Sequence, residues 1–291
     1  MKTFVLTALS LLLSFTASAQ FWGPHSRVLT DSIHSDVLDA NRAYTVYLPK
    51  SFDANPDKTY PVLYIFHGIG GTNLGWFNDQ RVNEVADRLI ASGEAKEMVI
   101  VSPNAGGNMF DPNVWSGYFN MPGWNYEDFF FTEFLPYIEK TYRCGGSKGQ
   151  RALAGLSMGG GGATSYGQRH PDMFGSVYAM SALMNIPEMG AVADNNPGSK
   201  LSLLNESVNK LNTIDYVKNA DDATKEQLRT LEWFVDCGDD DFLLDRNLEF
   251  MHAMRAAGIP MQLRVRDGGH DNEYWHSGLF GCLPFVSRNF K

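Results

Sequence analysis

The sequence predicts an α/β fold in which helices flank a mainly parallel central sheet, and three observations support this prediction. Short apolar runs rich in β-branched and aromatic residues end at turn-forming residues, as VLYIF (62–66) does at His67-Gly68. Such unbroken runs suit strands that are covered on both faces. Segments with apolar residues at helical spacing separate these runs, and the 291 residues contain neither a low-complexity linker nor a repeat.

The expected elements alternate along the chain between strand and helix. Strands are expected at 44–48, 62–66, 98–101, 151–154, 174–180, 231–235 and 261–266. The last of these runs, MQLRVR, alternates polar and apolar residues, as a half-covered or edge strand does. Helices are expected at 81–92, 126–142 and 158–169.

Residues 181–230 form a stretch of about fifty residues that is too long for a simple connection. We expect it to be a helical insertion over the sheet, between the strand after helix 158–169 and the strand at 231–235. Insertions in that place shape a pocket. The expected organisation is therefore a lead segment at 20–41 and a single domain at 42–291.

Residues 1–19 have the pattern of a secretory signal peptide. Lys2 precedes an apolar run from 4 to 15, and Ala17-Ser18-Ala19 forms a small-residue cleavage site. The run is too short to cross a hydrocarbon core of about 30 Å as a helix, and no cysteine lies near the cleavage site to carry a lipid. We expect cleavage after Ala19 and a secreted or periplasmic protein with no membrane segment after cleavage.

Charge and cysteine content narrow the range of partners and folds. The chain has 24 Lys and Arg against 33 Asp and Glu, a formal net charge of -9, which argues against a nucleic-acid partner. The three cysteines, Cys144, Cys237 and Cys282, allow at most one internal disulfide and do not say which pair would form it. None lies in a nucleophile motif, so we expect buried structural thiols. The composition does not indicate whether the protein is a monomer or an oligomer.

The run GLSMGGGG (155–162) contains a nucleophile elbow. A phosphate-binding loop would need Lys and Ser or Thr after its last glycine, and these are absent. Gly155-Leu156-Ser157-Met158-Gly159 instead matches G-x-S-x-G between a strand and a helix, with glycines where side chains would collide. Ser157 is the expected nucleophile, and the amide of Met158 the expected oxyanion donor. The extra glycines 160–162 are expected to let the helix start pack closely on the sheet.

A second glycine turn follows the strand at 62–66. His67-Gly68-Ile69-Gly70-Gly71 stands where α/β-hydrolases place another oxyanion amide, which we assign to Ile69. His67 is expected to shape the turn through hydrogen bonds rather than to act as a base.

An acid and a histidine follow two later strands, in the order that the fold requires. The strand at 231–235 enters a cluster of carboxylates that includes Asp239, Asp240 and Asp241, and the strand at 261–266 enters Gly268-Gly269-His270. The acidic cluster does not fit a calcium loop, because leucines occupy its fifth and sixth positions. No zinc motif appears among the seven histidines, so no metal or cofactor is implied.

Together these residues resemble the esterase D superfamily and, within it, the carbohydrate esterase family 1, which includes feruloyl and acetylxylan esterases. The matching stretches are VYLPKSFD, YPVLYIFHGIGG, VIVSPN, FLPYIEKTYR, LAGLSMGGGGA, HPDMFGSV, CGDDDFL and GGHDNEYW. They cover nearly all of the chain from about Arg42, and residues 181–230 match much less well.

The resemblance implies an α/β-hydrolase fold and a serine esterase with the triad Ser157, Asp241 and His270. It selects Asp241 because the family's acid lies three residues beyond the glycine that corresponds to Gly238. It also implies esters of plant cell walls, feruloyl or acetyl groups on xylan, as substrates, with their choice decided in 181–230.

Four tryptophans are candidates for a groove that holds a sugar or a phenolic acyl group, although aromatic core packing is the ordinary alternative for each. They are Trp76, Trp115, Trp124 and Trp275. Other functions stay open on the same scaffold: an esterase of another small ester, such as a siderophore lactone or an S-formylglutathione-like thioester, or an acyltransferase. A catalytically inactive sugar-binding module would lack at least one residue of the triad, and all three are present in this sequence.

Overall fold

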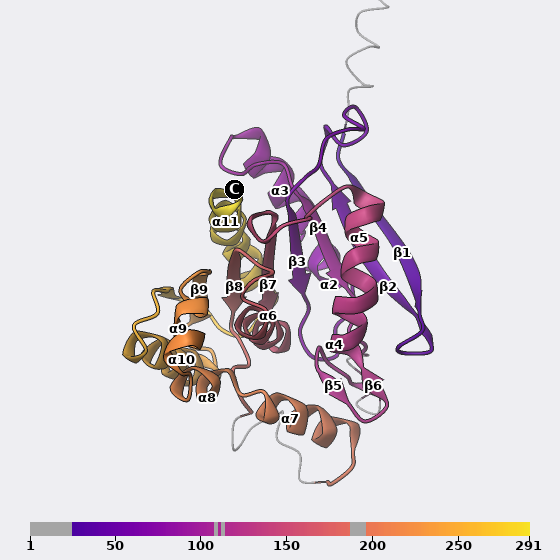
Figure 1. Ribbon diagram of the computed structural model, residues 1–291. Coiled ribbons are helices and arrows are strands. Elements are labelled where there is room, and N and C mark those ends of the chain that lie inside the picture. The colour runs from indigo at the N-terminus through magenta and orange to yellow at the C-terminus, as the bar shows by residue number, and fades with distance from the viewer. Residues whose placement is uncertain (1–24, 108–109, 112–113, 187–195) are drawn as a thin grey trace, which may run out of the picture.

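The computed structural model describes residues 25–107, 110–111, 114–186 and 196–291, and it has the α/β architecture that the sequence predicts (Figure 1). Its strands are β1 (Arg27–Ser35), β2 (Ala40–Leu48), β3 (Val62–Phe66), β4 (Val99–Pro103), β5 (Asn120–Met121), β6 (Trp124–Asn125), β7 (Arg151–Leu156), β8 (Ser176–Met180), β9 (Glu232–Gly238) and β10 (Gln262–Arg266). Its longer helices are α3 (Val82–Ala91), α5 (Leu135–Tyr142), α6 (Met158–Arg169), α7 (Lys200–Lys210), α10 (Leu244–Ala256) and α11 (Asn272–Asn289). Its shorter helices are α2 (Gly75–Asn78), α4 (Tyr126–Phe129), α8 (Thr213–Lys218), α9 (Asp222–Leu228), the π-helical turn η2 (Phe130–Phe134) and the 3-10 turn η3 (Lys148–Gln150). The signal peptide expected at 1–19 lies outside the described residues.

Eight strands form one sheet in the order β1-β2-β4-β3-β7-β8-β9-β10. Neighbouring strands from β4 to β10 are parallel, whereas β2 pairs antiparallel with both β1 and β4. Because parallel strands end at one edge of a sheet, the turns after β3, β7, β8, β9 and β10 meet there. In open sheets of this kind, ligands bind outside the carboxyl ends of the strands.

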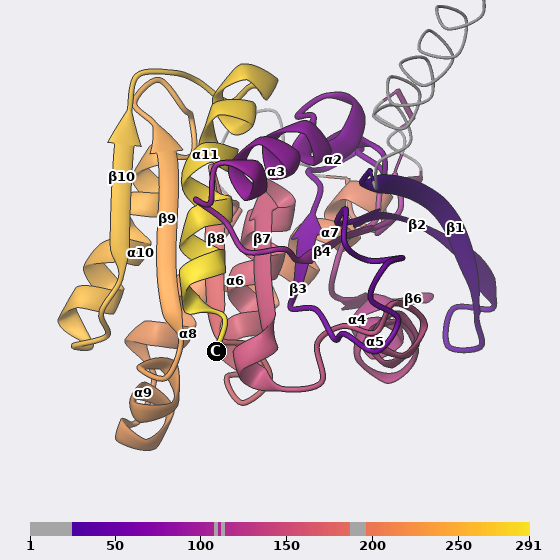
Figure 2. The same cartoon turned by 90° about the horizontal axis from the view of Figure 1, so that it is seen from above.

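The central strands are buried on both faces, as their unbroken apolar runs predict. In β3, Tyr64 and Phe66 belong to one apolar cluster, which also contains residues of α5 and α6. Leu63 and Ile65 belong to the other cluster, which contains residues of α3 and α11. Figure 2 shows α3 and α11 on one side of the sheet and α6 on the other. The two helix layers hold the strands, and with them the turns at the strand ends, in a fixed arrangement.

Most expected elements are confirmed, with ends that shift by at most four residues, the largest shift being the start of β2 at Ala40 instead of 44. The expected helix 126–142 is a continuous run of α4, η2 and α5, with a π-helical turn in its middle. The expected insertion at 181–230 contains α7, α8 and α9, and its residues 187–195 lie outside the described part. Residues 27–35, in the expected lead segment, form β1 and pair along their whole length with β2.

Two further findings concern membranes and thiols. None of the helices in the described part of the chain is both long and apolar enough to cross a membrane. The cysteines Cys144, Cys237 and Cys282 are free and buried. Burial raises the pKa of each of these thiols, as expected for structural rather than reactive cysteines.

Candidate active site

Ser157 stands in a sharp turn between β7 and α6. Its backbone has φ 54° and ψ −121°, a conformation that residues other than glycine rarely adopt. A Cβ at Gly155 would lie 2.2 Å from the carbonyl oxygen of Gly159, and a Cβ at Gly159 would lie 2.3 Å from the carbonyl oxygen of Phe66. Glycine at 155 and 159 is therefore required, as the elbow motif predicts.

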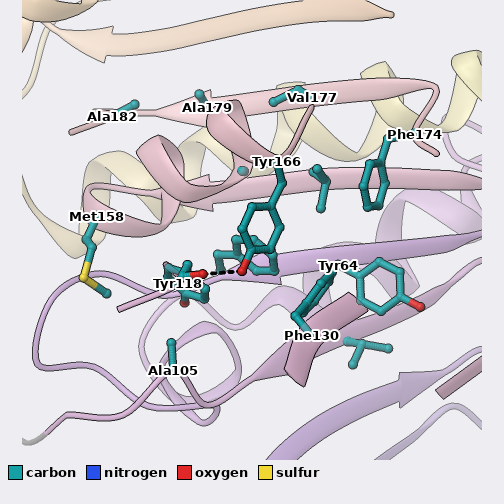
Figure 3. Packing of buried hydrophobic residues seen from close by; sticks show 14 of the residues in the cluster. Tyr64, Ala105, Tyr118, Phe130, Met158, Tyr166, Phe174, Val177, Ala179 and Ala182 are labelled. Carbon is teal, nitrogen blue, oxygen red and sulfur yellow. Dashed lines mark hydrogen bonds between the residues drawn. The ribbon is translucent and has the colours of Figure 1, made fainter. Parts of the chain in front are cut away.

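Of the extra glycines, Gly160 packs close to the sheet as expected, since a Cβ there would lie 3.1 Å from the carbonyl oxygen of Gly155 in β7, whereas Gly161 and Gly162 serve other contacts. A Cβ at Gly161 would lie 2.0 Å from the carbonyl oxygen of Leu183, and one at Gly162 would lie 3.0 Å from the ring of Tyr118. These neighbours belong to the segment after β8 and to the loop before β5, not to the sheet. Figure 3 shows Tyr118 beside α6, where Tyr166 donates a hydrogen bond to the carbonyl oxygen of Tyr118. The glycines thus bring α6 against the loops that surround Ser157.

The structure brings Ser157, His270 and Asp241 together from the ends of three parallel strands. His270 Nε2 lies 2.9 Å from Ser157 Oγ. His270 Nδ1 lies 3.0 Å from Asp241 Oδ1 and 2.9 Å from Oδ2. The neighbouring carboxylates do not reach the histidine: Asp239 is exposed and its Oδ1 accepts a hydrogen bond from the amide of Gly268 at 3.0 Å, and Asp240 is exposed.

The surroundings of Asp241 keep its carboxyl ionised. Burial raises the pKa of this carboxyl, but the hydrogen bonds that it accepts, including those from His270 and the amide of Leu243, together outweigh burial, so that the net shift is downward. An ionised carboxylate only accepts hydrogen bonds, so Nδ1 of His270 must donate to it. Nε2 is then left to accept the hydroxyl proton of Ser157, which is the arrangement a general base needs.

The glycine turn after β3 is held by His67. The amide of Ala105 donates to His67 Nε2 at 3.1 Å, so Nδ1 carries the proton and donates to the carbonyl oxygen of Gly68 at 2.8 Å. Burial lowers the pKa of His67 to about 4, so the ring is neutral. The hydroxyl of Tyr118 donates to the carbonyl oxygen of His67 at 3.1 Å. These contacts agree with the expected role of His67 in shaping the turn.

The two backbone amides expected to bind an oxyanion lie on turns next to Ser157. A Cβ at Gly68 would lie 3.4 Å from Ser157 Cβ, which places the turn that contains Ile69 against the serine. Met158 is the first residue of α6, so its amide has no acceptor within the helix. The positive end of the helix dipole adds to the attraction of an anion there.

A cavity of about 400 Å³ opens beside Ser157. Its lining includes Ile69, His270 and two of the four candidate tryptophans, Trp76 and Trp275. Polar side chains that the sequence did not single out also line it, namely Asp79, Gln80, Asp271 and Asn272. Lysine and arginine are absent from this lining, among the residues that the structure describes. A larger hollow of about 560 Å³ lies among α6, α7, α8 and α9, and no triad residue lines it.

The other two candidate tryptophans, Trp115 and Trp124, are not part of the cavity lining in the described structure. Both are half-buried. The indole of Trp124 stacks on Tyr126 with ring centroids 5.5 Å apart, and its N–H donates to the carbonyl oxygen of Gly117 at 2.8 Å. The guanidinium of Arg42 lies over the Trp124 ring, 4.7 Å from its centroid. Trp124 therefore packs as part of the fold around β6.

Two residues near the histidine were not predicted from the sequence. Phe242 follows Asp241 directly, is 56% exposed, and its ring centroid lies 4.6 Å from that of His270. Ser181 follows β8, is fully buried, and accepts a hydrogen bond from Trp275 Nε1 at 3.0 Å. Their positions in the chain could have indicated them. Phe242 directly follows the acid, and Ser181 directly follows a strand of the parallel sheet.

A protein-family model named Esterase, with the description "Putative esterase", matches residues 35–286 of the chain. The match includes the turns after β3, β7, β9 and β10, and therefore every residue discussed around Ser157.

Several known proteins are similar to this chain over most of its length. A solved ferulic acid esterase is 62% identical, with a TM-score of 0.89 and coverage of 92% of this chain and 100% of the other. An acetyl esterase of Caldicellulosiruptor saccharolyticus is 22% identical over 276 residues, which cover 90% of this chain and 98% of the relative. A solved ferulic acid esterase of Anaeromyces mucronatus, in complex with ferulic acid, shares the fold at 21% identity, with a TM-score of 0.70 and coverage of 92% and 93%.

Proposed function

The chain belongs to the esterase family, and from this premise we propose that it hydrolyses carboxylic esters with Ser157 as nucleophile, His270 as general base and Asp241 as the acid that orients the histidine. One observation carries the proposal: His270 Nε2 lies 2.9 Å from Ser157 Oγ while its Nδ1 lies 2.9 Å from a buried carboxylate. This geometry is what a serine nucleophile requires.

Each step of the proposed reaction uses one of these contacts. Ser157 Oγ attacks the ester carbonyl carbon as its proton passes to His270 Nε2, and Asp241 stabilises the imidazolium. The amides of Ile69 and Met158 bind the oxygen that becomes negative. His270 then gives the proton to the leaving alcohol, which leaves an acyl-enzyme on Ser157. A water molecule, deprotonated by His270, attacks the acyl carbon and releases the acid.

We propose feruloyl or acetyl esters of plant cell-wall polysaccharide as the substrates. The strongest support is the ferulic acid esterase that is 62% identical over its whole length. A cavity of about 400 Å³ with Trp275 in its wall has room and aromatic surface for a phenolic acyl group, whereas Trp76 behind the lining is fully buried. The carboxylates of Asp79 and Asp271, with no lysine or arginine among the described lining residues, would repel the two carboxylates of a glutathione thioester.

We further propose that the protein is exported, because a polysaccharide of the cell wall is reached only from outside the cell. The support is the signal-peptide pattern of residues 1–19, with cleavage after Ala19. Mass spectrometry of the protein from cell fractions and culture medium would test this: export is wrong if the protein is found only in the cytoplasm, and cleavage after Ala19 is wrong if the exported chain still carries Lys2.

The activity is tested with the protein from Gln20 onward and a panel of methyl ferulate, acetylated xylan, p-nitrophenyl acetate and S-formylglutathione. We expect the first three to be hydrolysed and Ser157→Ala to lose at least about 1,000-fold in kcat. Activity that survives in Ser157→Ala would end the triad proposal, and a preference for the thioester would overturn the substrate. Added methanol, if it captured most of the feruloyl group, would point to an acyltransferase.

A further inference from the structure

The base of the triad is carried by the loop 267–271, which connects β10 to α11. Gly268 and Gly269 directly precede His270 in this loop. Gly268 has φ 137°, and a Cβ there would lie 2.6 Å from the ring of Tyr274, so a side chain is excluded. Glycine has more conformational freedom to lose on folding than any other residue. The position of His270 therefore depends on contacts that hold this loop from outside.

The first half of the loop is attached to the turn that carries the acid. The amide of Asp239 donates to the carbonyl oxygen of Arg266 at 3.1 Å. The amide of Asp240 donates to the carbonyl oxygen of Gly268, also at 3.1 Å. A Cβ at Gly238 would lie 2.0 Å from that same oxygen of Gly268, so the two turns are in backbone contact. These bonds hold the residues before the base and do not reach those after it.

The second half of the loop is held by Arg266, the last residue of β10. Its Nη2 donates to the carbonyl oxygen of Tyr274 at 2.8 Å, and its Nη1 donates to Ser277 Oγ at 2.7 Å. Its guanidinium also lies over the ring of Tyr274, with Cζ 3.6 Å from the ring centroid. One side chain thus joins the strand before the loop to the first turn of the helix after it.

Asp236 of β9 is fully buried and joins the same two residues. The hydroxyl of Tyr274 lies 2.6 Å from Asp236 Oδ1, and Arg266 Nε lies 3.3 Å from the same oxygen. Tyr178 of β8 donates to Asp236 Oδ2 at 2.8 Å. Burial raises the pKa of both phenols, so they stay protonated and donate. Two of these donors come from the two ends of the loop that carries His270.

The first turn of α11 in turn contacts the base. Trp275 follows Tyr274, and its ring lies edge-on to His270, with centroids 4.9 Å apart and planes at 88°. Asp271 follows His270 and caps the same helix, because its Oδ1 accepts a hydrogen bond from the amide of Tyr274 at 2.8 Å. A displacement of Tyr274 would therefore move both the ring packed on the imidazole and the residue next to it in the chain.

We propose that Asp236, Arg266 and Tyr274, here called the clasp, are positioning residues that hold the loop 267–271 so that His270 Nε2 faces Ser157. This inference rests on the proposed triad function. The described residues that line the cavity include none of the clasp, so loosening the clasp should lower kcat and leave KM unchanged. A misplacement of about 1 Å in a catalytic group can cost about 100-fold in rate.

Two matched pairs of variants test the proposal with methyl ferulate. Tyr274→Phe and Tyr178→Phe each remove one phenol hydroxyl from Asp236, but only Tyr274 adjoins the loop. Arg266→Met and Arg264→Met each remove one guanidinium from the same face of β10. Arg264 lies over an aromatic ring of β9 instead of the loop, with Cζ 5.5 Å from the ring centroid. The second variant of each pair therefore measures the cost to the fold alone.

We expect Tyr274→Phe to lose roughly 3- to 10-fold in kcat and Arg266→Met roughly 10- to 100-fold, each with KM within about 2-fold of the wild type. Tyr178→Phe and Arg264→Met should keep kcat within about 2-fold of the wild type. Urea denaturation should show similar stability for Tyr274→Phe and Tyr178→Phe, because each removes one donor from the same carboxyl. A difference in kcat between these two then reports the position of the base rather than the stability of the fold.

The proposal is overturned if the two variants of either pair lose kcat equally, because the clasp would then act only on the fold. It is also overturned if the losses appear in KM alone. If Arg266→Met does not fold, Arg266→Lys takes its place: it keeps the positive charge but not the planar fork of donors, and it should still lose kcat relative to Arg264→Lys.

Ser157→Ala, measured in parallel, separates a failure of the clasp from a failure of the triad. If Ser157→Ala keeps the wild-type activity, the triad itself is wrong. If it is inactive while Tyr274→Phe and Arg266→Met match their controls, only the positioning role is wrong.

Discussion

Gly159 lies so close to Phe66 that a Cβ on the glycine would be 2.3 Å from the phenylalanine's carbonyl oxygen. The same Cβ would be 2.5 Å from the carbonyl oxygen of His67. The start of α6 therefore rests on the backbone of the turn after β3. These are the two segments that carry the amides of Met158 and Ile69, so their separation is set by a contact between backbones that a side chain would disrupt.

Gly159→Ala should therefore damage both the fold and the activity. Neither backbone can move without displacing a strand end, so we expect a loss of about 3 kcal/mol in the free energy of unfolding. Hydrolysis of p-nitrophenyl acetate should fall sharply in the fraction that folds, because the two amides no longer face the same oxygen. Urea denaturation and activity measurements on the folded protein check this.

Gly75→Ala is the control for stability. A Cβ at Gly75 meets only the side chain of Asp79, at 3.7 Å, which is an ordinary contact. Its free energy of unfolding should be close to that of the wild type. Equal stability of the two variants would contradict the contact between α6 and the turn after β3.

His67 should make the stability of the protein depend on pH. Burial lowers the pKa of His67 from 6.5 to about 4, so between these values the unfolded chain binds more protons than the folded one. The stabilisation from this group is complete above pH 6.5 and is lost as the pH falls toward 4. From pH 7 to 4.5 the wild type should lose about 2 kcal/mol more in its free energy of unfolding than His67→Gln.

Chemical denaturation of both proteins at pH 7 and 4.5 measures the difference. The variant is expected to be the less stable protein at pH 7, because the bond from the amide of Ala105 is disturbed, and to have the flatter pH dependence. If the free energy of unfolding of the two proteins changed equally between pH 7 and 4.5, His67 would not be buried as a neutral ring.

We expect substitution of the three consecutive aspartates, Asp239, Asp240 and Asp241, to have three different effects. Asp241→Asn should lower kcat by roughly 10³- to 10⁴-fold with the fold intact, since the amide no longer holds the charge that stabilises the imidazolium. Asp240→Asn should stay close to the wild type, because Asp240 is exposed. Asp239→Asn disturbs the bond from the amide of Gly268 and should act mainly on stability. Steady-state kinetics together with thermal unfolding distinguish these results, and the assignment is wrong if Asp240→Asn shows the large loss.

The sequence predicted the elements of the site that depend on neighbouring residues in the chain. The elbow around Ser157 and the turn before His270 are local patterns, and parallel strands bring their ends together whatever the loops contain. The choice of Asp241 over Asp239 and Asp240 needed the family resemblance, because three adjacent carboxylates on a turn do not reveal which one points inward.

Other features depend on contacts between distant segments, and the sequence gives no local sign of them. Ser181 and Trp275 are 94 residues apart in the chain, and their hydrogen bond follows from how α11 packs beside β8. Helix α11 itself was not predicted, because Gly278 and Pro284 interrupt its pattern. Gly278 is accommodated because α11 packs closely on β8: a Cβ there would lie 3.1 Å from Met180 Sδ. The sequence likewise could not show that Trp76 belongs to the cavity lining whereas Trp124 does not.

The acidic cavity should make the enzyme sensitive to the charge of its substrate. Asp79 and Asp271 line the cavity, and no lysine or arginine accompanies them among its described lining residues. An ester that carries a carboxylate near the reacting group is therefore repelled, and salt screens this repulsion over a Debye length of about 10 Å at 0.1 M. The kcat/KM for 4-carboxyphenyl acetate should rise about 2- to 5-fold between about 0.02 and 0.5 M NaCl, while that for phenyl acetate stays constant.

Two charge-neutralising variants show whether the cavity or the net charge of -9 causes the effect. Asp79→Asn removes one charge from the lining and should weaken the salt response of 4-carboxyphenyl acetate. Asp57→Asn removes one exposed charge just before β3, at the opposite edge of the sheet from Ser157, and should leave the response unchanged. If both variants weaken it equally, the repulsion comes from the whole protein, and the cavity does not select neutral esters by its own charges.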